Sequence, residues 1–190
     1  MPLTKKIFRE TCLRKLKNSS KYNKIYKDSL VNKLLMNELK SVKNKTILFY
    51  YPMPNEVNIL KVLKKLRQTN HILLPFMVGK SFKVVPYRLP IYASKFGIFE
   101  ARNSIKKIQK IDIAIVPVVG IDSNLQRIGF GKGMYDRFFS KLQKKPYTLF
   151  IQPELCFTKE KVCDDYDVKC DVLLTPKVKM VARKRERYVK

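Results

Sequence analysis

Residues 111–139 read IDIAIVPVVGIDSNLQRIGFGKGMYDRFF, an almost unbroken apolar run followed by a glycine-rich loop and an aromatic segment. An apolar run such as residues 111–119 is typical of a strand that is buried on both faces of a parallel sheet. Tyr135, Phe138, Phe139 and Leu142 then recur at helical spacing. The stretch therefore predicts a strand, a loop and a helix in succession, and it places the loop at the carboxyl end of a central strand, where ligands of such sheets bind.

The segments around this stretch alternate between helix and strand patterns. Helix patterns cover residues 1–18, 21–40 and 59–66. Strand patterns cover residues 47–50, 72–76, 147–151 and 171–176, with a strand and turn at 81–90 and a loop at 96–104. We therefore expect an α/β fold: a single three-layer α/β/α domain with a mostly parallel sheet and two N-terminal helices. The domain would span residues 1–190, with a basic C-terminal tail at residues 177–190.

The formal net charge of +26 suggests attraction to polyanions such as nucleic acid, a membrane surface or an anionic substrate. Most of the basic residues are lysines spread along the chain, whereas a protein specialised in binding phosphate groups or bases usually depends on bidentate arginine contacts. No apolar run approaches the roughly 20 residues of a membrane helix, and the N-terminus lacks the pattern of a secretory signal. We expect a cytoplasmic protein that binds no membrane, and we keep a basic nucleic-acid-binding module as the alternative function.

The cysteines predict neither a metal site nor a disulfide framework. Cys12, Cys156, Cys163 and Cys170 form no CxxC pair, and the single histidine, His71, lies far from them in sequence. A zinc site is therefore not expected. The spacing favours small, buried or half-buried thiols in a reducing compartment.

The glycine-rich loop has the composition of an anion site. Its three alternating glycines allow the backbone to approach a ligand and to turn N–H groups toward it. Arg127 and Lys132 would add a guanidinium fork and a point charge for phosphate oxygens, and a helix beginning near Gly133 would add its dipole. The loop matches neither the Walker pattern nor GxGxxG. The alternative is a tight connection in which Asp136 complements the start of a helix.

The segment RIGFGKGMYDRFF, preceded by PVVGID, closely resembles the glycine-rich signature of the 5-formyltetrahydrofolate cyclo-ligase family. The resemblance covers nearly the whole chain: KKIFRE resembles the family's opening helix, YPMPNEVN the segment with its folate-contacting acid, and DVKCDVLLTP its ending. Met134 departs from the pattern, because the family commonly has a tyrosine there. The resemblance implies ATP- and Mg²⁺-dependent conversion of 5-formyltetrahydrofolate to 5,10-methenyltetrahydrofolate, with release of ADP and phosphate. The formyl oxygen would be phosphorylated before N10 closes the ring.

The resemblance also implies a role for each residue of the site. The expected ATP-binding residues are Lys5, Arg9, Arg127, Gly129, Gly131, Lys132, Gly133, Met134 and Tyr135. Of these, Lys132 and Arg127 would be catalytic. The expected substrate-binding residues are Tyr51, Glu56, Phe130, Met134 and Tyr135. Asp136 and Asp171 would hold Mg²⁺ together with ATP oxygens. The partners would be ATP and a reduced folate, with or without a polyglutamate tail, and the protein would be a monomer.

Each of these residues also has a purely structural interpretation. Lys5 and Arg9 could form a solvated basic face of a helix, and Glu56 could complement a helix dipole. Asp171 could be a turn residue before a strand, and Tyr135 could belong to the core. A nucleotide-binding protein without catalysis is a third possible function, but Glu56 stands in the expected segment and argues against it.

Overall fold

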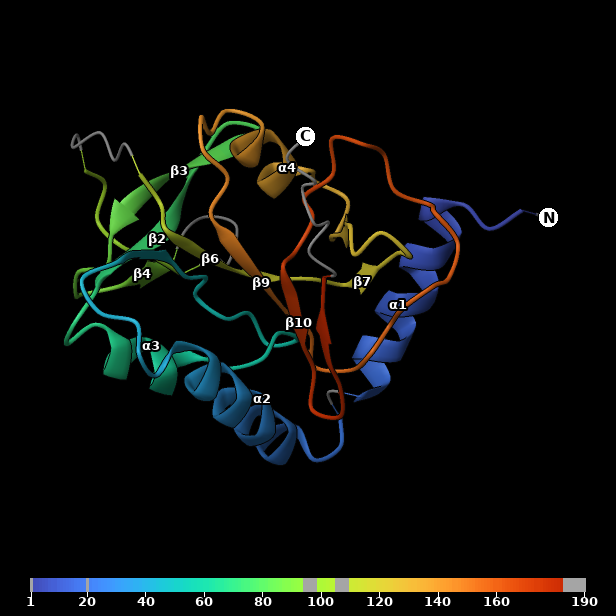
Figure 1. Ribbon diagram of the computed structural model, residues 1–190, viewed down its shortest axis with the longest axis horizontal. Coiled ribbons are helices and arrows are strands. Elements are labelled where there is room, and N and C mark those ends of the chain that lie inside the picture. The colour runs from blue at the N-terminus through green and yellow to red at the C-terminus, as the bar shows by residue number, and fades with distance from the viewer. Residues whose placement is uncertain (1, 20, 94–98, 105–109, 183–190) are drawn as a thin grey trace, which may run out of the picture.

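A seven-stranded sheet runs through the protein in the computed structural model, which describes residues 2–19, 21–93, 99–104 and 110–182 (Figure 1). The strand order is β11-β10-β9-β6-β1-β2-β3. The strand bounds are β1 Thr46–Leu48, β2 His71–Val78, β3 Ser81–Pro86, β6 Ile113–Pro117, β9 Tyr147–Ile151, β10 Val172–Leu174 and β11 Lys179–Val181. All neighbouring strands pair in parallel except at the two edges, where β3 and β11 are antiparallel. The expected α/β fold with a mostly parallel sheet is confirmed.

Alternate residues of the central strand β6 belong to different hydrophobic cores, as the two-residue period of a strand requires. Ile113 and Ile115 pack in one cluster with α2 (Lys24–Leu39) and α3 (Leu60–Leu66). Ala114 and Val116 pack in a second cluster with the phenylalanines of α4 (Met134–Phe139). Figure 1 shows α2 and α3 on one side of the sheet and α4 on the other, so the three layers are those that the sequence predicts.

The first helix, α1 (Lys5–Ser19), stands beside the sheet rather than on either face of it. Its apolar residues Phe8, Cys12 and Leu16 form a third cluster with Val119 and Ile128, which lie in or next to a small hairpin. Figure 1 shows α1 alongside that hairpin, at the end of the molecule marked N. The expectation of two N-terminal helices is therefore correct, but only the second one covers the sheet.

The hairpin replaces most of the loop predicted after the central strand. Its strands are β7 (Gly120–Ile121) and β8 (Arg127–Ile128), which pair antiparallel. The buried carboxylate of Asp122 closes the turn by accepting the backbone N–H groups of Asn124 at 2.9 Å and Gln126 at 3.0 Å. The hairpin leads directly to Gly129 and α4. Because α4 has only six residues, its dipole contributes less to an anion site than the sequence suggested.

Two other predicted irregular segments contain short strands. Within the predicted loop, β5 (Phe99–Glu100) pairs with β4 (Tyr92–Ala93). Within the predicted basic tail, β11 pairs with β10, in the register that sets Met180 opposite Leu173. Met180 packs against the core while its neighbours point outward, so an edge strand is stabilised there despite the lysines. Residues 96–98 of the predicted loop and 183–190 of the predicted tail lie outside the described residues.

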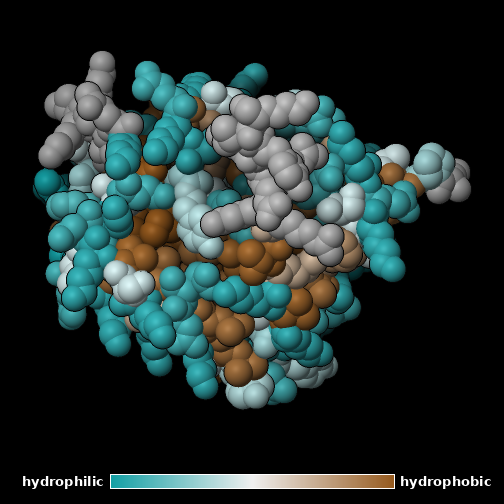
Figure 2. Space-filling model, viewed as in Figure 1, coloured by the Kyte–Doolittle hydropathy of each residue, from teal (hydrophilic) through white to brown (hydrophobic). Residues whose placement is uncertain are grey.

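The surface reflects the high lysine content. Hydrophilic residues cover most of the face seen in Figure 2, and hydrophobic residues gather near its centre. Within the described part of the chain, no helix has both the length and the apolar composition needed to cross a bilayer.

Candidate functional site

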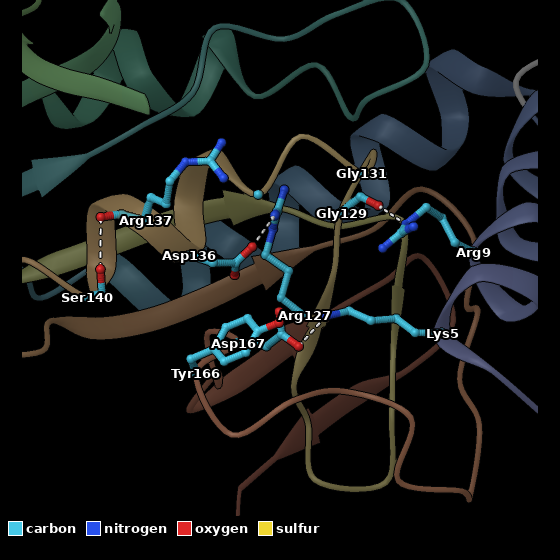
Figure 3. Close-up of a pocket in the computed structure, with 11 residues that line it drawn as sticks. Lys5, Arg9, Arg127, Gly129, Gly131, Asp136, Arg137, Ser140, Tyr166 and Asp167 are labelled. Carbon is cyan, nitrogen blue, oxygen red and sulfur yellow. Dashed lines mark hydrogen bonds and ion pairs between the residues drawn. The ribbon is translucent and has the colours of Figure 1, made fainter. Parts of the chain in front are cut away.

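A pocket of about 370 Å³ lies where α1, the glycine-rich segment, α4 and the segment before β10 meet (Figure 3). Its lining residues are Lys5, Arg9, Arg127, Gly129, Gly131, Gly133, Asp136, Arg137, Ser140, Tyr166 and Asp167. Cations and glycines dominate this set, so the pocket has the character that phosphate groups require. The structure thus brings together two sets of expected ATP-binding residues, from α1 and from the glycine-rich segment, that are about 120 residues apart in sequence.

Arg127 is the buried cation of the pocket, with only 5% of its surface exposed. Its Nε donates to the carbonyl oxygen of Pro117 at 3.2 Å, its guanidinium carbon lies 4.6 Å from the centre of the Tyr135 ring, and its Nη1 lies 4.0 Å from Oδ2 of Asp136. Burial lowers the pKa of Arg127, and the nearby charge of Asp136 opposes that shift. An arginine side chain stays protonated in proteins, so a fixed positive charge faces the pocket.

The alternating glycines are needed for different structural reasons. A Cβ atom at Gly129 would lie 2.7 Å from Cζ of Arg127, so this glycine leaves room for the guanidinium group. Gly131 and Gly133 have φ angles of 100° and 59°, which L-amino acids with side chains seldom adopt. The glycine pattern therefore forms a close approach and two left-handed turns in the wall of the pocket.

The two cations of α1 lie one turn apart and both reach the pocket, as Figure 3 shows. Lys5 donates to Oδ2 of Asp164 at 3.1 Å and to Oδ2 of Asp167. Burial alone would lower the pKa of Lys5, but these two bonds outweigh it and raise the pKa. Arg9 donates from Nε to the carbonyl oxygen of Gly129 at 3.0 Å. These contacts connect α1 to both the glycine-rich segment and the segment before β10.

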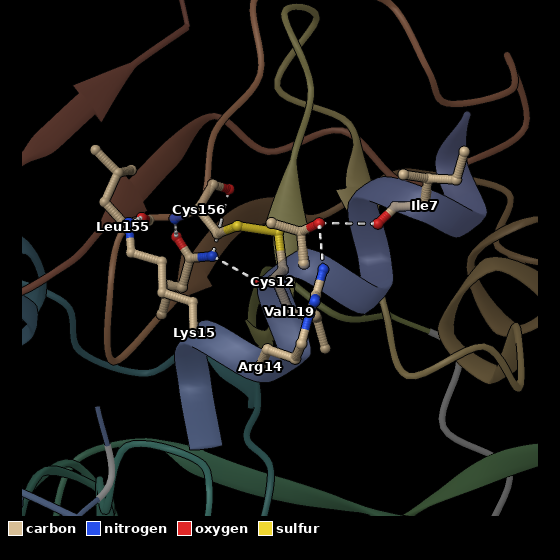
Figure 4. Close-up of a disulfide and its surroundings, with 9 residues drawn as sticks. Ile7, Cys12, Arg14, Lys15, Val119, Leu155 and Cys156 are labelled. Atoms are coloured by element: carbon tan, nitrogen blue, oxygen red, sulfur yellow. Dashed lines mark hydrogen bonds between the residues drawn. A yellow bond between two sulfur atoms is a disulfide. The ribbon is translucent and has the colours of Figure 1, made fainter. Parts of the chain in front are cut away.

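A disulfide between Cys12 and Cys156 attaches α1 to the segment that follows β9 (Figure 4). The expectation of four thiols was therefore wrong for this pair. The two residues are 144 positions apart, and only the packing of α1 beside the sheet brings their Cα atoms within 5.7 Å. Cys163 and Cys170 are free and buried, as expected, and burial raises the pKa of Cys170 to about 12.

The two aspartates expected to hold a metal do not line the same cavity. Asp136 lines the pocket and accepts the backbone N–H of Val168 at 3.3 Å. Asp171 lies at the amino end of β10, where its carboxylate accepts the N–H of Thr148 at 2.7 Å, and it lines a neighbouring cavity. Asp167, four residues earlier, lines the pocket with Asp136. Among the described residues, no group of three or more His, Cys, Asp or Glu side chains forms a metal site by itself.

Glu56, the expected folate-binding acid, is a buried carboxylate in the segment between β1 and α3. Its Oε2 accepts the N–H of Met53 at 2.9 Å, and only 6% of its surface is exposed. Burial raises the pKa of Glu56 from 4.5 to about 7, while the Met53 N–H and the charges of Arg127 and Lys24 act in the opposite direction. Glu56 also contributes to raising the pKa of Tyr135. The carboxylate therefore lies within electrostatic range of the glycine-rich segment.

The other residues expected to bind substrate surround this region to different degrees. The ring of Tyr51 packs on Phe99 with centres 5.4 Å apart. Tyr135 and Met134 are half-buried and pack against the hydrophobic core on the α4 side of the sheet. The ring of Tyr135 contacts both Arg127 and the core residue Phe82, so it belongs to the core and also lies next to the pocket. Phe130 is 39% exposed.

Lys132 is the expected catalytic residue that the structure does not bring into the pocket. Its side chain is exposed and is not among the lining residues. Its backbone carbonyl oxygen accepts a bond from the guanidinium of Arg137, which also donates from Nε to the carbonyl oxygen of Lys80 at 2.8 Å. Arg137 thus connects the glycine-rich segment to the β2–β3 turn.

Four pocket residues were not predicted from the sequence: Arg137, Ser140, Tyr166 and Asp167. Arg137 lies one helical turn after Gly133, so the predicted helix could have indicated it. Asp167 lies in the run CDDYDVKCD, which offers four aspartates without a periodicity that selects one of them. Only the path of this segment over the pocket distinguishes Asp167 from the others.

Comparisons with known proteins agree with this geometry. A model of the 5-formyltetrahydrofolate cyclo-ligase family matches residues 3–176. The 5-formyltetrahydrofolate cyclo-ligase of Mycoplasma pneumoniae is 27% identical over 174 residues, which cover 90% of this chain and 98% of that protein. A probable 5-formyltetrahydrofolate cyclo-ligase of Schizosaccharomyces pombe is 27% identical over 153 residues, covering 70% of this chain and 75% of that protein. The NMR structure of Aquifex aeolicus 5,10-methenyltetrahydrofolate synthetase, at 22% identity and a TM-score of 0.74 over 98% of each chain, has the same fold. The chain therefore belongs to the 5-formyltetrahydrofolate cyclo-ligase family.

Proposed function

We propose that this protein, acting as one domain over residues 1–190, converts 5-formyltetrahydrofolate to 5,10-methenyltetrahydrofolate and uses ATP to do so. The observation that carries the proposal is the position of Arg127. Its guanidinium lines a pocket rich in cations, and its charge also acts on the buried carboxylate of Glu56. A phosphate site and a site for a polar heterocycle would therefore meet at one fixed positive charge.

The chemistry needs such a meeting point. The formyl oxygen is a poor leaving group, so transfer of the γ-phosphoryl group of ATP to it would prepare the carbon for attack by N10, after which phosphate departs. Phosphoryl transfer depends on positioning and on neutralising the oxygens that gain charge. Arg127 is suited to that task because its Nε bond to Pro117 fixes its orientation before substrate arrives. Lys5 and Arg9 would bind the remaining phosphates.

Lys5 would exchange partners when ATP binds. In the structure its ammonium group is paired with Asp167 and Asp164. A phosphate oxygen in the pocket would compete for that ammonium group and release the carboxylate of Asp167. Arg9 would keep its bond to the carbonyl oxygen of Gly129 through Nε and present its remaining N–H groups to phosphate.

The donor set of the pocket fits Mg²⁺. This ion is usually held by one or two carboxylates together with phosphate oxygens and water, and Asp136 and Asp167 both line the pocket. We propose these two as its ligands, with Asp167 in the role first expected of Asp171. The bound ion would neutralise phosphate charge. Asp171 would instead hold the amino ends of β9 and β10 in register through its bond to Thr148.

Glu56 would recognise the pterin. A pterin edge presents adjacent N–H donors, and a carboxylate can accept two of them at once. Because burial raises the pKa of Glu56 to about 7, much of the free protein would carry this residue protonated near neutral pH. N–H donors from the substrate favour the ionised form, so binding would be accompanied by loss of that proton. Tyr51, Phe130, Met134 and Tyr135 would provide the apolar surroundings.

The experiment that tests the proposal is an absorbance assay for methenyltetrahydrofolate with purified protein, 5-formyltetrahydrofolate, Mg²⁺ and ATP. We expect the signal only when ATP is present. A folded protein that binds ATP but gives no signal would refute the proposal. Arg127→Gln should lower kcat by about 100-fold or more, whereas Arg14→Gln, an exposed arginine on α1 outside the pocket, should leave it unchanged.

Two further variants test α1 and the glycine-rich segment. Arg9→Gln should raise the KM for ATP, and it keeps the test valid if Arg127→Gln does not fold. Lys132→Ala tests whether this exposed lysine moves into the pocket during turnover, with the exposed Lys33→Ala on α2 as its control. Equal kcat for the two lysine variants would exclude a catalytic role for Lys132.

A further inference from the structure

The segment that carries Glu56 has no regular secondary structure. Residues 49–59 connect β1 to α3 and belong to neither a helix nor a strand, so their positions depend on contacts made one residue at a time. Glu56 closes a turn here, because its N–H donates to the carbonyl oxygen of Met53 and its Oε2 accepts the N–H of Met53, both at 2.9 Å. The direction of the carboxylate therefore depends on how the backbone at Glu56 is held.

Three consecutive carbonyl groups of this segment each accept a hydrogen bond from a side chain. The donors and acceptors are Nζ of Lys24 to Glu56 at 2.7 Å, the hydroxyl of Tyr50 to Val57 at 2.8 Å, and Nδ2 of Asn32 to Asn58 at 2.8 Å. Two of the three donors, Lys24 and Asn32, belong to α2 and lie on one face of that helix. Side chains of α2 thus hold the backbone that carries Glu56.

The ammonium group of Lys24 is itself held in place by Asp28, one turn further along α2. Nζ lies 2.8 Å from Oδ2 of Asp28, whose side chain is only 13% exposed. An exposed pair at this spacing would contribute little, but here one partner is buried and the other reaches a carbonyl group 32 residues away. The helix is fixed in turn, because Val31 and Leu35 pack in the same core as Val57.

Helix stability does not explain a lysine at this position. Lys24 is the first residue of α2, where a cation opposes the helix dipole, and the first turn contains no acidic residue to offset it. Residues that break a local rule in this way are found at functional sites. The charge of Lys24 also acts on the carboxylate, since it opposes, as Arg127 does, the rise in the pKa of Glu56 that burial causes.

We propose that Lys24 is a positioning residue for the folate: it holds the Glu56 carbonyl against α2 and so sets the direction in which the Glu56 carboxylate meets the pterin. The inference rests on the proposed function, because it takes Glu56 to bind the pterin. A carboxylate that accepts two adjacent N–H donors must present both oxygens in line with them, so a small rotation of the backbone weakens binding. A helix that contributes no residue to the cation-rich pocket thereby acts on the second substrate.

The test measures kcat and the KM of each substrate with the methenyltetrahydrofolate absorbance assay. Lys24→Met removes the charge and the donors, Lys24→Arg keeps both, and Lys33→Met changes an exposed lysine of α2 that takes part in none of these contacts. Loss of a bond from a charged donor should raise the KM for 5-formyltetrahydrofolate about 10-fold in Lys24→Met. Substrate and transition state lose the same interaction, so kcat and the KM for ATP should change by no more than about twofold. Lys24→Arg should stay within about threefold of the unchanged protein, and Lys33→Met within about twofold.

A double-mutant cycle shows whether Lys24 acts through Glu56. The glutamine of Glu56→Gln has one acceptor oxygen instead of two, so binding depends less on its direction. In that background Lys24→Met should raise the KM for the folate by no more than about threefold. Lys24→Met leaves Asp28 buried without its partner, which can prevent folding. Adding Asp28→Asn removes that charge, and the double variant should show the same 10-fold rise, or about that, as Lys24→Met.

Several results would overturn the inference. They are an unchanged KM for the folate in Lys24→Met, an equal rise in the KM for ATP, a KM in Lys24→Arg as high as in Lys24→Met, and the same factor with and without Glu56→Gln. In an unchanged protein that is active, any of these refutes the role of Lys24 alone. An unchanged protein that forms no methenyltetrahydrofolate refutes the proposed function and this inference with it.

Discussion

Replacing Gly129 by alanine should damage this protein through a contact with Arg127. The added Cβ atom would lie 2.7 Å from Cζ of Arg127, well inside the 3.5–4.0 Å at which carbon atoms normally pack. The guanidinium cannot withdraw without loss, because it is buried, bonded to the carbonyl oxygen of Pro117 and stacked against Tyr135. The substitution therefore forces either the backbone or the buried cation to move.

The magnitude follows from these two consequences. Overpacking a core site costs about 1–3 kcal/mol, and leaving a buried polar group without its partner costs a further 1–3 kcal/mol or so. Part of the clash can be relieved by small shifts, so we expect Gly129→Ala to lower the free energy of unfolding by about 2–4 kcal/mol. It should also lower kcat, because Arg127 would no longer face the pocket in the same orientation.

Urea unfolding of the purified variants measures the first effect, with the denaturant slope checked for constancy. A double-mutant cycle identifies the cause. If the clash is with the guanidinium, Gly129→Ala should cost at least about 1 kcal/mol less when Arg127 is already leucine. A loss of stability in Gly129→Ala below about 0.5 kcal/mol, or the same loss in both backgrounds, would refute the reasoning.

Three other predictions concern the acid, the disulfide and the aspartates. The folded protein binds the Glu56 proton more tightly than the unfolded chain does, so its stabilising effect is complete below pH 4.5 and is lost as pH rises through about 7. The free energy of unfolding should therefore fall by about 3 kcal/mol between pH 4.5 and 8. Glu56→Gln should abolish this fall in urea unfolding measured over the same range, and a fall of equal size in the variant would contradict the assignment. Reducing Cys12–Cys156 with a dithiol should lower the free energy of unfolding by about 3–5 kcal/mol, because the bond closes a loop of 144 residues, and should weaken ATP binding because α1 carries part of the pocket. An unchanged urea midpoint and an unchanged affinity for ATP after reduction would contradict these two expectations. Asp167→Asn should raise the Mg²⁺ concentration needed for half-maximal turnover, while Asp171→Asn should lower thermal stability with that requirement unchanged; the reverse pattern would restore Asp171 as the ligand.

Local patterns were sufficient to predict most of the secondary structure. The apolar run at residues 111–119 contains β6, and its lack of alternation correctly indicated a strand buried on both faces. The helical spacing in residues 21–40 and 59–66 correctly indicated α2 and α3. These features depend on residues a few positions apart, for which the period of the chain directly determines which side chains share a face.

The sequence also indicated the position of the pocket. The glycine-rich segment follows the central strand, and Lys5 and Arg9 are one helical turn apart, so each half of the cation-rich pocket lining could be predicted locally. The resemblance of the chain to the cyclo-ligase family indicated that these two halves belong to one site. Residue patterns alone left Lys5 and Arg9 as a solvated face, because no periodicity connects a helix to a segment 120 residues away.

Tertiary structure alone decided the features that depend on distant segments meeting. Packing of α1 beside the sheet pairs Cys12 with Cys156, and the path of the chain before β10 puts Asp167 rather than Asp171 at the pocket. Burial raises the pKa of Glu56, which is an ordinary acid in the sequence. The physical reason is common to all three: a local pattern determines which way a side chain points, but only the assembled sheet and the helices packed on it determine which residues that side chain contacts.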